Sequence, residues 1–117
     1  MNQIYIAGLI FLSGFLTYSA VSHLTNGRRG LQFRVHALLA GICLVMAALI
    51  PSEIMVLRAG NLADYLAASR FNVAGLILIS SLLPWFFAEY ADVHPKPVLF
   101  GSSFLHAAVF LANLIQP

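Results

Sequence analysis

Four long stretches of this sequence carry no charged residue, and they constrain the fold more than any other feature. They cover residues 1–27, 35–52, 71–88 and 97–117. The shortest stretches hold 18 residues, within the range of about 17–25 that a helix needs to cross a hydrocarbon core about 30 Å thick. The pattern therefore predicts four membrane-spanning helices.

The composition agrees with this reading. Hydrophobic residues make up 61% of the 117 residues and charged residues 9%, whereas soluble domains are about 45–50% apolar and about 25% charged. We predict an all-α integral membrane protein, one domain over residues 1–117, with its transmembrane helices in an up-down bundle. The expected helices cover residues 3–24, 34–57, 63–90 and 97–115. Such helices leave no room for a soluble domain, and a net charge of +2 gives no indication of nucleic-acid binding.

The distribution of basic residues predicts the orientation. The connection between the first two helices carries three arginines and no acid: Arg28, Arg29 and Arg34. Basic residues near helix ends are retained on the cytoplasmic side of a membrane. Lys96 lies on the same side by alternation, while Arg58 and Arg70 fall outside, so the N-terminus and Pro117 are expected to face outward. We expect the bacterial inner membrane as the location.

The segment LLPWFFAEYADVHPKP, residues 82–97, contains the predicted end of the third helix, where it leaves the membrane. Proline inside a helix removes a backbone donor, and membrane helices tolerate it when a nearby group satisfies the freed carbonyl. We expect a kink at Pro84, with Ser80 and Ser81 supplying that group. The aromatic residues that follow are typical of a belt at the headgroup level. The predicted membrane-interface residues are Trp85, Phe86, Tyr90, Arg28, Arg29 and Arg34.

The order of residues 65–97 is more specific than the belt alone. An arginine stands beside an aromatic residue, Arg70 and Phe71, and the helix closes on Pro-Trp-Phe and Ala-Glu-Tyr before a loop with Pro95. This order resembles the N-terminal, seven-helix type of membrane sensor region in bacterial histidine kinases and diguanylate cyclases. The segments GRRGLQFRVHALLAGICLVMAAL and FLANLIQP resemble the second helix and the end of the fourth helix of that region.

The resemblance implies a role in signal transduction. That family has seven helices with the N-terminus outside, and its signalling domains follow in the cytoplasm. This sequence holds only the first four, so we expect the partners to be the lipid bilayer, the missing downstream helices and a cytoplasmic signalling domain, with a homodimer as a further option. We expect a sensor region of the two-component type that detects a small or lipid-like ligand or the state of the membrane. The sequence contains no catalytic constellation, so the chain itself is not expected to be an enzyme.

Polar residues near the outer ends of the third and fourth helices are candidates for ligand binding. Polar groups inside a bilayer are costly and frequently functional. The candidate residues are Tyr65, Arg70, Asn72, Asn113 and Gln116. The simpler alternative is that Arg70 anchors the helix at the interface or pairs with Asp64 or Glu53, and that the amides bond between helices.

Four histidines give a second candidate chemistry. His23 and His36 flank the first cytoplasmic connection, His94 lies in the second, and His106 lies well inside the fourth helix. Imidazoles that face each other across neighbouring helices can ligate haem or a transition metal. No two histidines stand four residues apart, and no closed metal set is visible. We therefore assign no cofactor and no metal, and keep His23, His36 and His106 as the residues to examine.

Two other functions stay open for a chain of this size. Small four-helix multidrug transporters need a carboxylate in the first span for proton coupling, and residues 3–24 contain none. An accessory subunit of a larger membrane complex is the other alternative. Small residues four apart, Ala37 with Gly41 and Ala108 with Ala112, predict close helix contacts within one chain or between two.

Overall fold

The computed structural model describes residues 3–27 and 33–116, and these residues form four α-helices with no strand. The helices are α1 (Gln3–Gly27), α2 (Phe33–Leu57), α3 (Leu62–Ala91) and α4 (Lys96–Ile115). Each is long and apolar enough to cross a membrane. The expected all-helical, four-span pattern is therefore present, and the expected bounds differ from these by at most three residues, at the end of α1.

The ends of α3 show how local chemistry sets the helix bounds. Asn61 caps the first turn, because its side-chain oxygen accepts a hydrogen bond of 2.9 Å from the backbone N–H of Asp64. At the other end, Asp92 adopts a left-handed conformation with φ of 55°. The N–H of Val93 then donates to the Ala88 carbonyl at 3.0 Å, which closes the last turn. Pro95 and Pro97 follow, and α4 starts there.

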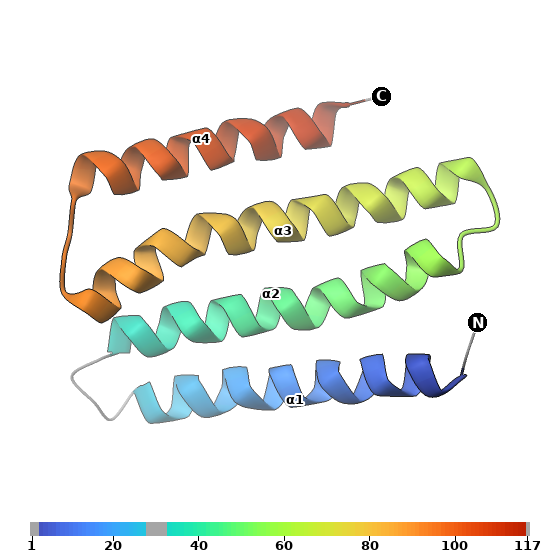
Figure 1. Cartoon of the computed structure of the whole chain (residues 1–117), viewed down its shortest axis with the longest axis horizontal. Coiled ribbons are helices and arrows are strands. Elements are labelled where there is room, and N and C mark those ends of the chain that lie inside the picture. Colours follow the sequence, from blue (N-terminus) through green and yellow to red (C-terminus); the bar gives the residue numbers. More distant parts are fainter. Residues whose placement is uncertain (1–2, 28–32, 117) are drawn as a thin grey trace.

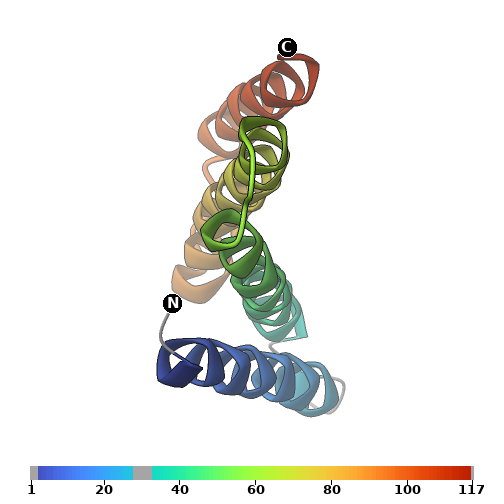
Figure 2. The same cartoon turned by 90° about the vertical axis from the view of Figure 1, so that its right-hand side faces the viewer.

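The helices run alternately up and down and lie side by side in chain order (Figure 1). Contacts between helices occur only for α1 with α2, α2 with α3 and α3 with α4, within the part of the chain that is described. The molecule measures 47 × 32 × 16 Å, so its thin dimension is little more than one helix diameter of about 10–12 Å. The end view shows a bent row (Figure 2). The helices therefore form an open up-and-down layer, and the predicted up-down bundle is not confirmed.

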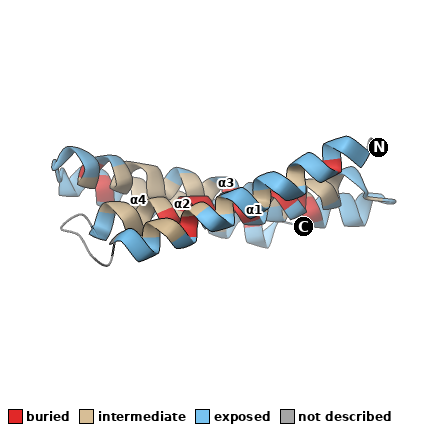
Figure 3. Ribbon diagram, turned by 90° about the horizontal axis from the view of Figure 1, so that it is seen from below, coloured by how far each residue is buried: buried red, intermediate tan, exposed pale blue. Residues whose placement is uncertain are grey.

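An open layer leaves most apolar side chains uncovered. Buried residues form short patches along the helices, and most of the ribbon is exposed (Figure 3). The core between α1 and α2 consists of small residues, Ala20, Ala40 and Cys43, with Leu39 packed against them. A surface of exposed Phe, Leu and Ile suits a lipid environment, because water would penalise apolar area of this extent. The four apolar helices indicate a multi-pass membrane protein.

Two prolines lie inside helices, and the structure treats them differently. Pro51 in α2 cannot donate to the carbonyl four residues earlier, which belongs to Ala47. Ser13 of α1 donates to that carbonyl at 3.1 Å, so a neighbouring helix supplies the missing donor. Pro84 lies within α3, which continues to Ala91. The nearby Ser81 donates to the Leu78 carbonyl at 2.8 Å and not to the Ser80 carbonyl that Pro84 frees. The expectation that Ser81 satisfies the freed carbonyl was therefore wrong. The kink at Pro84 stays a prediction.

Small residues shape the contacts between α2 and α3. Gly75 is buried, and a Cβ atom at this position would lie only 2.9 Å from Leu49 Cγ and closer still to one of its methyl groups. A Cβ atom at Gly41, which the spacing predicts as a contact, would lie at an ordinary 3.7 Å from a Leu82 methyl group. Ala108 and Ala112 are exposed, so the small-residue pair predicted on α4 does not pack within this chain.

Candidate functional site at the Glu89 end of the layer

One end of the layer gathers most of the titratable side chains that contact each other. This end, called the Glu89 end, comprises the last turns of α1 and α3 and the first turns of α2 and α4. The opposite end, called the Glu53 end, comprises the start of α1, the end of α2, the start of α3 and the end of α4 (Figure 1). Arg34 and Lys96, two of the basic residues used to predict the cytoplasmic side, lie at the Glu89 end, and Arg28 and Arg29 are outside the described residues.

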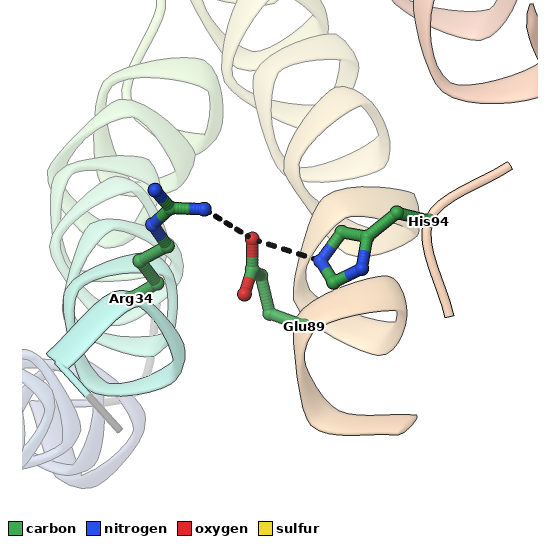
Figure 4. A network of polar contacts seen from close by, with 3 residues as sticks. All are labelled: Arg34, Glu89 and His94. Atoms are coloured by element: carbon green, nitrogen blue, oxygen red, sulfur yellow. Dashed lines mark hydrogen bonds and ion pairs between the residues drawn. The ribbon is translucent and has the colours of Figure 1, made fainter. Parts of the chain in front are cut away.

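Glu89 is the centre of a three-residue polar cluster, formed with Arg34 and His94. Arg34 Nη1 of α2 donates to Glu89 Oε1 of α3 at 3.5 Å, and His94 Nε2 lies 3.2 Å from the same oxygen. Figure 4 shows both side chains pointing at this carboxylate from opposite sides. The Glu89 side chain is 17% exposed, whereas that of Arg34 is 79% exposed. One carboxylate therefore links α2, α3 and the α3–α4 connection.

A second contact at this end joins two histidines. His23 near the end of α1 and His36 near the start of α2 place their Nδ1 atoms 3.2 Å apart. The ring centroids are 5.5 Å apart and the ring planes are tilted by 30°. Both residues are half-buried. The two candidates that the sequence places on either side of a connection are thus brought into direct contact.

The first turn of α2 contacts both neighbouring helices, α1 and α3. Successive helix residues are rotated by about 100°, so residues two apart point to nearly opposite sides. Arg34 reaches α3, and His36 reaches α1. The start of α2 therefore carries one polar link to each adjacent helix.

The predicted interface aromatics lie near this end but do not all face outward. Trp85 Nε1 donates to Ser103 Oγ of α4 at 2.7 Å, and its ring meets Phe100 edge-on with centroids 5.5 Å apart. Trp85 therefore helps to join α3 to α4. Phe86 stacks with Tyr90 at 6.1 Å between centroids, and Tyr90 is 73% exposed, as a belt residue would be.

His106 lies apart from the other histidines. Its Nδ1 is 2.7 Å from the Ser102 carbonyl on its own helix. Because a carbonyl only accepts, Nδ1 carries the hydrogen in this contact. His106 lines a groove of about 460 Å³ between α3 and α4, together with Trp85, Ser103 and apolar residues such as Ile77 and Phe110. The backbone of its own helix therefore supplies a partner for this imidazole.

Two of the five predicted ligand-binding residues form hydrogen bonds between helices. Asn72 donates to Glu53 Oε2 at 3.2 Å, and Asn113, which is buried, donates to the Arg70 carbonyl at 3.0 Å. These are the interhelical amide bonds of the simpler alternative. Neither Asp64 nor Glu53 forms an ion pair with Arg70 in the described structure. Tyr65 and Gln116 are exposed. Ligand binding by this set stays a prediction.

The side chains that meet at the Glu89 end are an arginine, a glutamate and three histidines, and such groups can bind ions or other polar partners. No group of three or more His, Cys, Asp or Glu side chains is close enough to hold a metal ion, as far as the described ranges extend. Glu89 and His94 were not predicted from the sequence as contact residues. The available signal was charge complementarity, because Arg34 and Glu89 lie in turns predicted on the same side of the membrane.

Comparisons with protein-family models, with curated proteins and with solved structures gave no match to this chain.

Proposed function

We propose that this chain is the membrane-embedded input region of a bacterial signal-transduction protein, with its Glu89 end in the cytoplasm. The observation that carries the proposal is the cluster of Arg34, Glu89 and His94. It ties α2 to the end of α3 and to the connection into α4, on the side where an output domain would work. A displacement of α3 relative to α2 therefore has to move Glu89 relative to Arg34.

The strength of this cluster suits a switch. Exposed ion pairs contribute about 0–1 kcal/mol, and the Arg34 side chain is mostly exposed. Coupling between two sites is typically about 1–3 kcal/mol, or about 5–150-fold in an equilibrium. A stimulus with a modest preference for one position of α3 is enough to break or restore the contact. A buried and fully paired network would resist such a change.

The open layer also favours the proposed arrangement. All four helices carry exposed large apolar side chains, so further helices can pack against the layer. The resemblance to a seven-helix sensor region implies three such helices and a cytoplasmic signalling domain. Catalysis would reside in that domain and not in this chain.

The same open layer favours a second candidate, an accessory subunit that packs against the helices of a larger membrane complex. The transporter alternative has less support. The first helix contains no acid, and Glu53 is bonded to Asn72 near a helix end. An embedded carboxylate that exchanges protons would need to lie inside a span.

The proposal can be tested in a strain that lacks the gene, complemented with variants of the chain in its native reading frame. Variant Arg34→Glu should abolish stimulus-dependent transcription, since two acidic side chains then face each other. The double variant Arg34→Glu/Glu89→Arg should restore the response, because it rebuilds the ion pair. Arg58→Glu is a control, as Arg58 is an exposed arginine near the Glu53 end.

Membrane abundance of each variant is measured in parallel. Unaltered transcription in the deletion strain under all tested stimuli would contradict the signalling role. Unaltered transcription with loss of a membrane complex from native gels would favour the accessory subunit.

A further inference from the structure

We propose that His23 and His36 form a binding site for a transition-metal cation that bridges α1 and α2. This inference does not depend on the proposed signalling role. It starts from the position of two imidazole nitrogens on neighbouring helices, His23 Nδ1 and His36 Nδ1, which are 3.2 Å apart. The rings approach through these nitrogens, with their planes tilted by only 30°.

The separation matches the geometry of a tetrahedral metal. A zinc–imidazole bond is about 2.0–2.1 Å long, so two nitrogens on a tetrahedral ion are about 3.3 Å apart. The observed 3.2 Å lies close to this value. A cation can therefore bind both nitrogens once the rings turn so that both nitrogens point at one position beside the line that joins them.

The chemistry of the pair also fits a cation of this class. Imidazole nitrogens are preferred ligands of zinc, copper and nickel, and an unprotonated ring nitrogen is the common state of histidine at neutral pH. Without metal, one Nδ1 can donate a hydrogen to the other, which accounts for the same short distance. A metal ion that binds here would displace that hydrogen, and the ring that carried it would bind the ion as its other neutral tautomer, with the hydrogen on Nε2.

Coordination by the protein is incomplete, and this sets the expected affinity. Among the described residues, no third His, Cys, Asp or Glu joins the pair. Structural zinc sites use four protein ligands, whereas sites with open positions bind water or other small ligands. The pair lies at the Glu89 end, where both residues are half-buried and not enclosed. We therefore expect an exchangeable ion and not a permanent structural one.

The guanidinium group of Arg34 does not point at the His23–His36 pair. Arg34 is two residues from His36 and is directed at Glu89 on α3 (Figure 4). Its charge is partly offset by that carboxylate. Since α1 contacts only α2 among the described helices, an ion shared by His23 and His36 would restrain α1 at this end of the layer.

The test uses the full chain, purified in detergent micelles and stripped of metal with a chelator. Zn²⁺ is titrated at neutral pH against a competing chromophoric chelator. We expect one ion per chain, and His23→Ala and His36→Ala should each weaken binding by at least about tenfold, the lower end of the effect seen for groups that only support ligands. His94→Ala and His106→Ala are matched controls and should keep the original affinity.

Two further measurements keep the test decisive. Circular dichroism establishes that each variant retains its helices. X-ray absorption of the zinc-loaded original chain should show two imidazoles in the first coordination shell, without the need for any variant. Absence of binding at millimolar Zn²⁺, equal affinity in all four variants, or fewer than two bound imidazoles would overturn the proposal.

Discussion

Replacing Gly75 with alanine tests the packing of α2 against α3, on which the layer depends. A Cβ atom at Gly75 would overlap the side chain of Leu49, with Leu49 Cγ at 2.9 Å. A Cβ atom at Gly101, in the second turn of α4, would meet nothing within 4 Å. The two substitutions add the same methyl group to a helix, but only one of them adds it to an occupied space.

The expected difference follows from two opposing effects. Alanine is more favourable than glycine inside a helix by about 0.8–1.0 kcal/mol, and this gain applies at both positions. Forcing an extra methyl group into a packed contact costs typically about 1–3 kcal/mol. Gly75→Ala should therefore lower the free energy of unfolding by about 1–3 kcal/mol relative to Gly101→Ala. Adding Leu49→Ala to Gly75→Ala removes the overlap and should recover part of that loss.

Unfolding can be followed by titrating the purified chain in mixed micelles with dodecyl sulfate. The protein has a single tryptophan, Trp85, which lies in the contact between α3 and α4, so its fluorescence reports separation of these helices. Far-UV circular dichroism supplies a second probe. Equal shifts of the unfolding midpoint for Gly75→Ala and Gly101→Ala would refute the packing described here.

Three further substitutions probe the polar links between helices. Ser13→Ala removes the donor to the Ala47 carbonyl. The free energy of unfolding should fall by about 0.6 kcal/mol, the mean for interhelical hydrogen bonds in membranes, and by no more than about 1.7 kcal/mol. An unchanged free energy of unfolding would mean that this bond is absent. Asn113→Ala removes the bond to the Arg70 carbonyl and should show a loss of the same size in the same titration. Glu89→Gln should lower stability by no more than about 1 kcal/mol, because the side chain of its partner Arg34 is largely exposed; a larger loss would contradict the proposal of an easily broken switch.

The helices themselves could be predicted because charge marks where each apolar run ends. The expected starts and ends agree with α1 to α4 within a few residues, and Asn61 and Pro95 stand where helix boundaries are expected. The arrangement of the helices could not be predicted in the same way. These helices are apolar on all sides, so no polar stripe distinguishes the side that faces protein from the side that faces lipid.

The candidate site was predicted in part, for a related reason. His23 and His36 were selected as individual residues, but their contact depends on the register of α1 against α2, which no local pattern encodes. Gly75 was missed because Phe71 and Ile79, four residues away on either side, hide it from a search for paired small residues. Its tight contact with Leu49 becomes visible only when α2 and α3 are placed together.

A topology assay tests most directly whether the layer spans the membrane with its Glu89 end in the cytoplasm. Alkaline phosphatase, which is active only outside the cytoplasm, is fused after Gly60 in the α2–α3 connection and after His94 in the α3–α4 connection. We predict an active enzyme for the fusion at Gly60 and an inactive one for the fusion at His94, with both fusions in the membrane fraction. Activity at His94 with none at Gly60, or equal activity at both positions, would contradict a membrane-spanning layer with its Glu89 end in the cytoplasm.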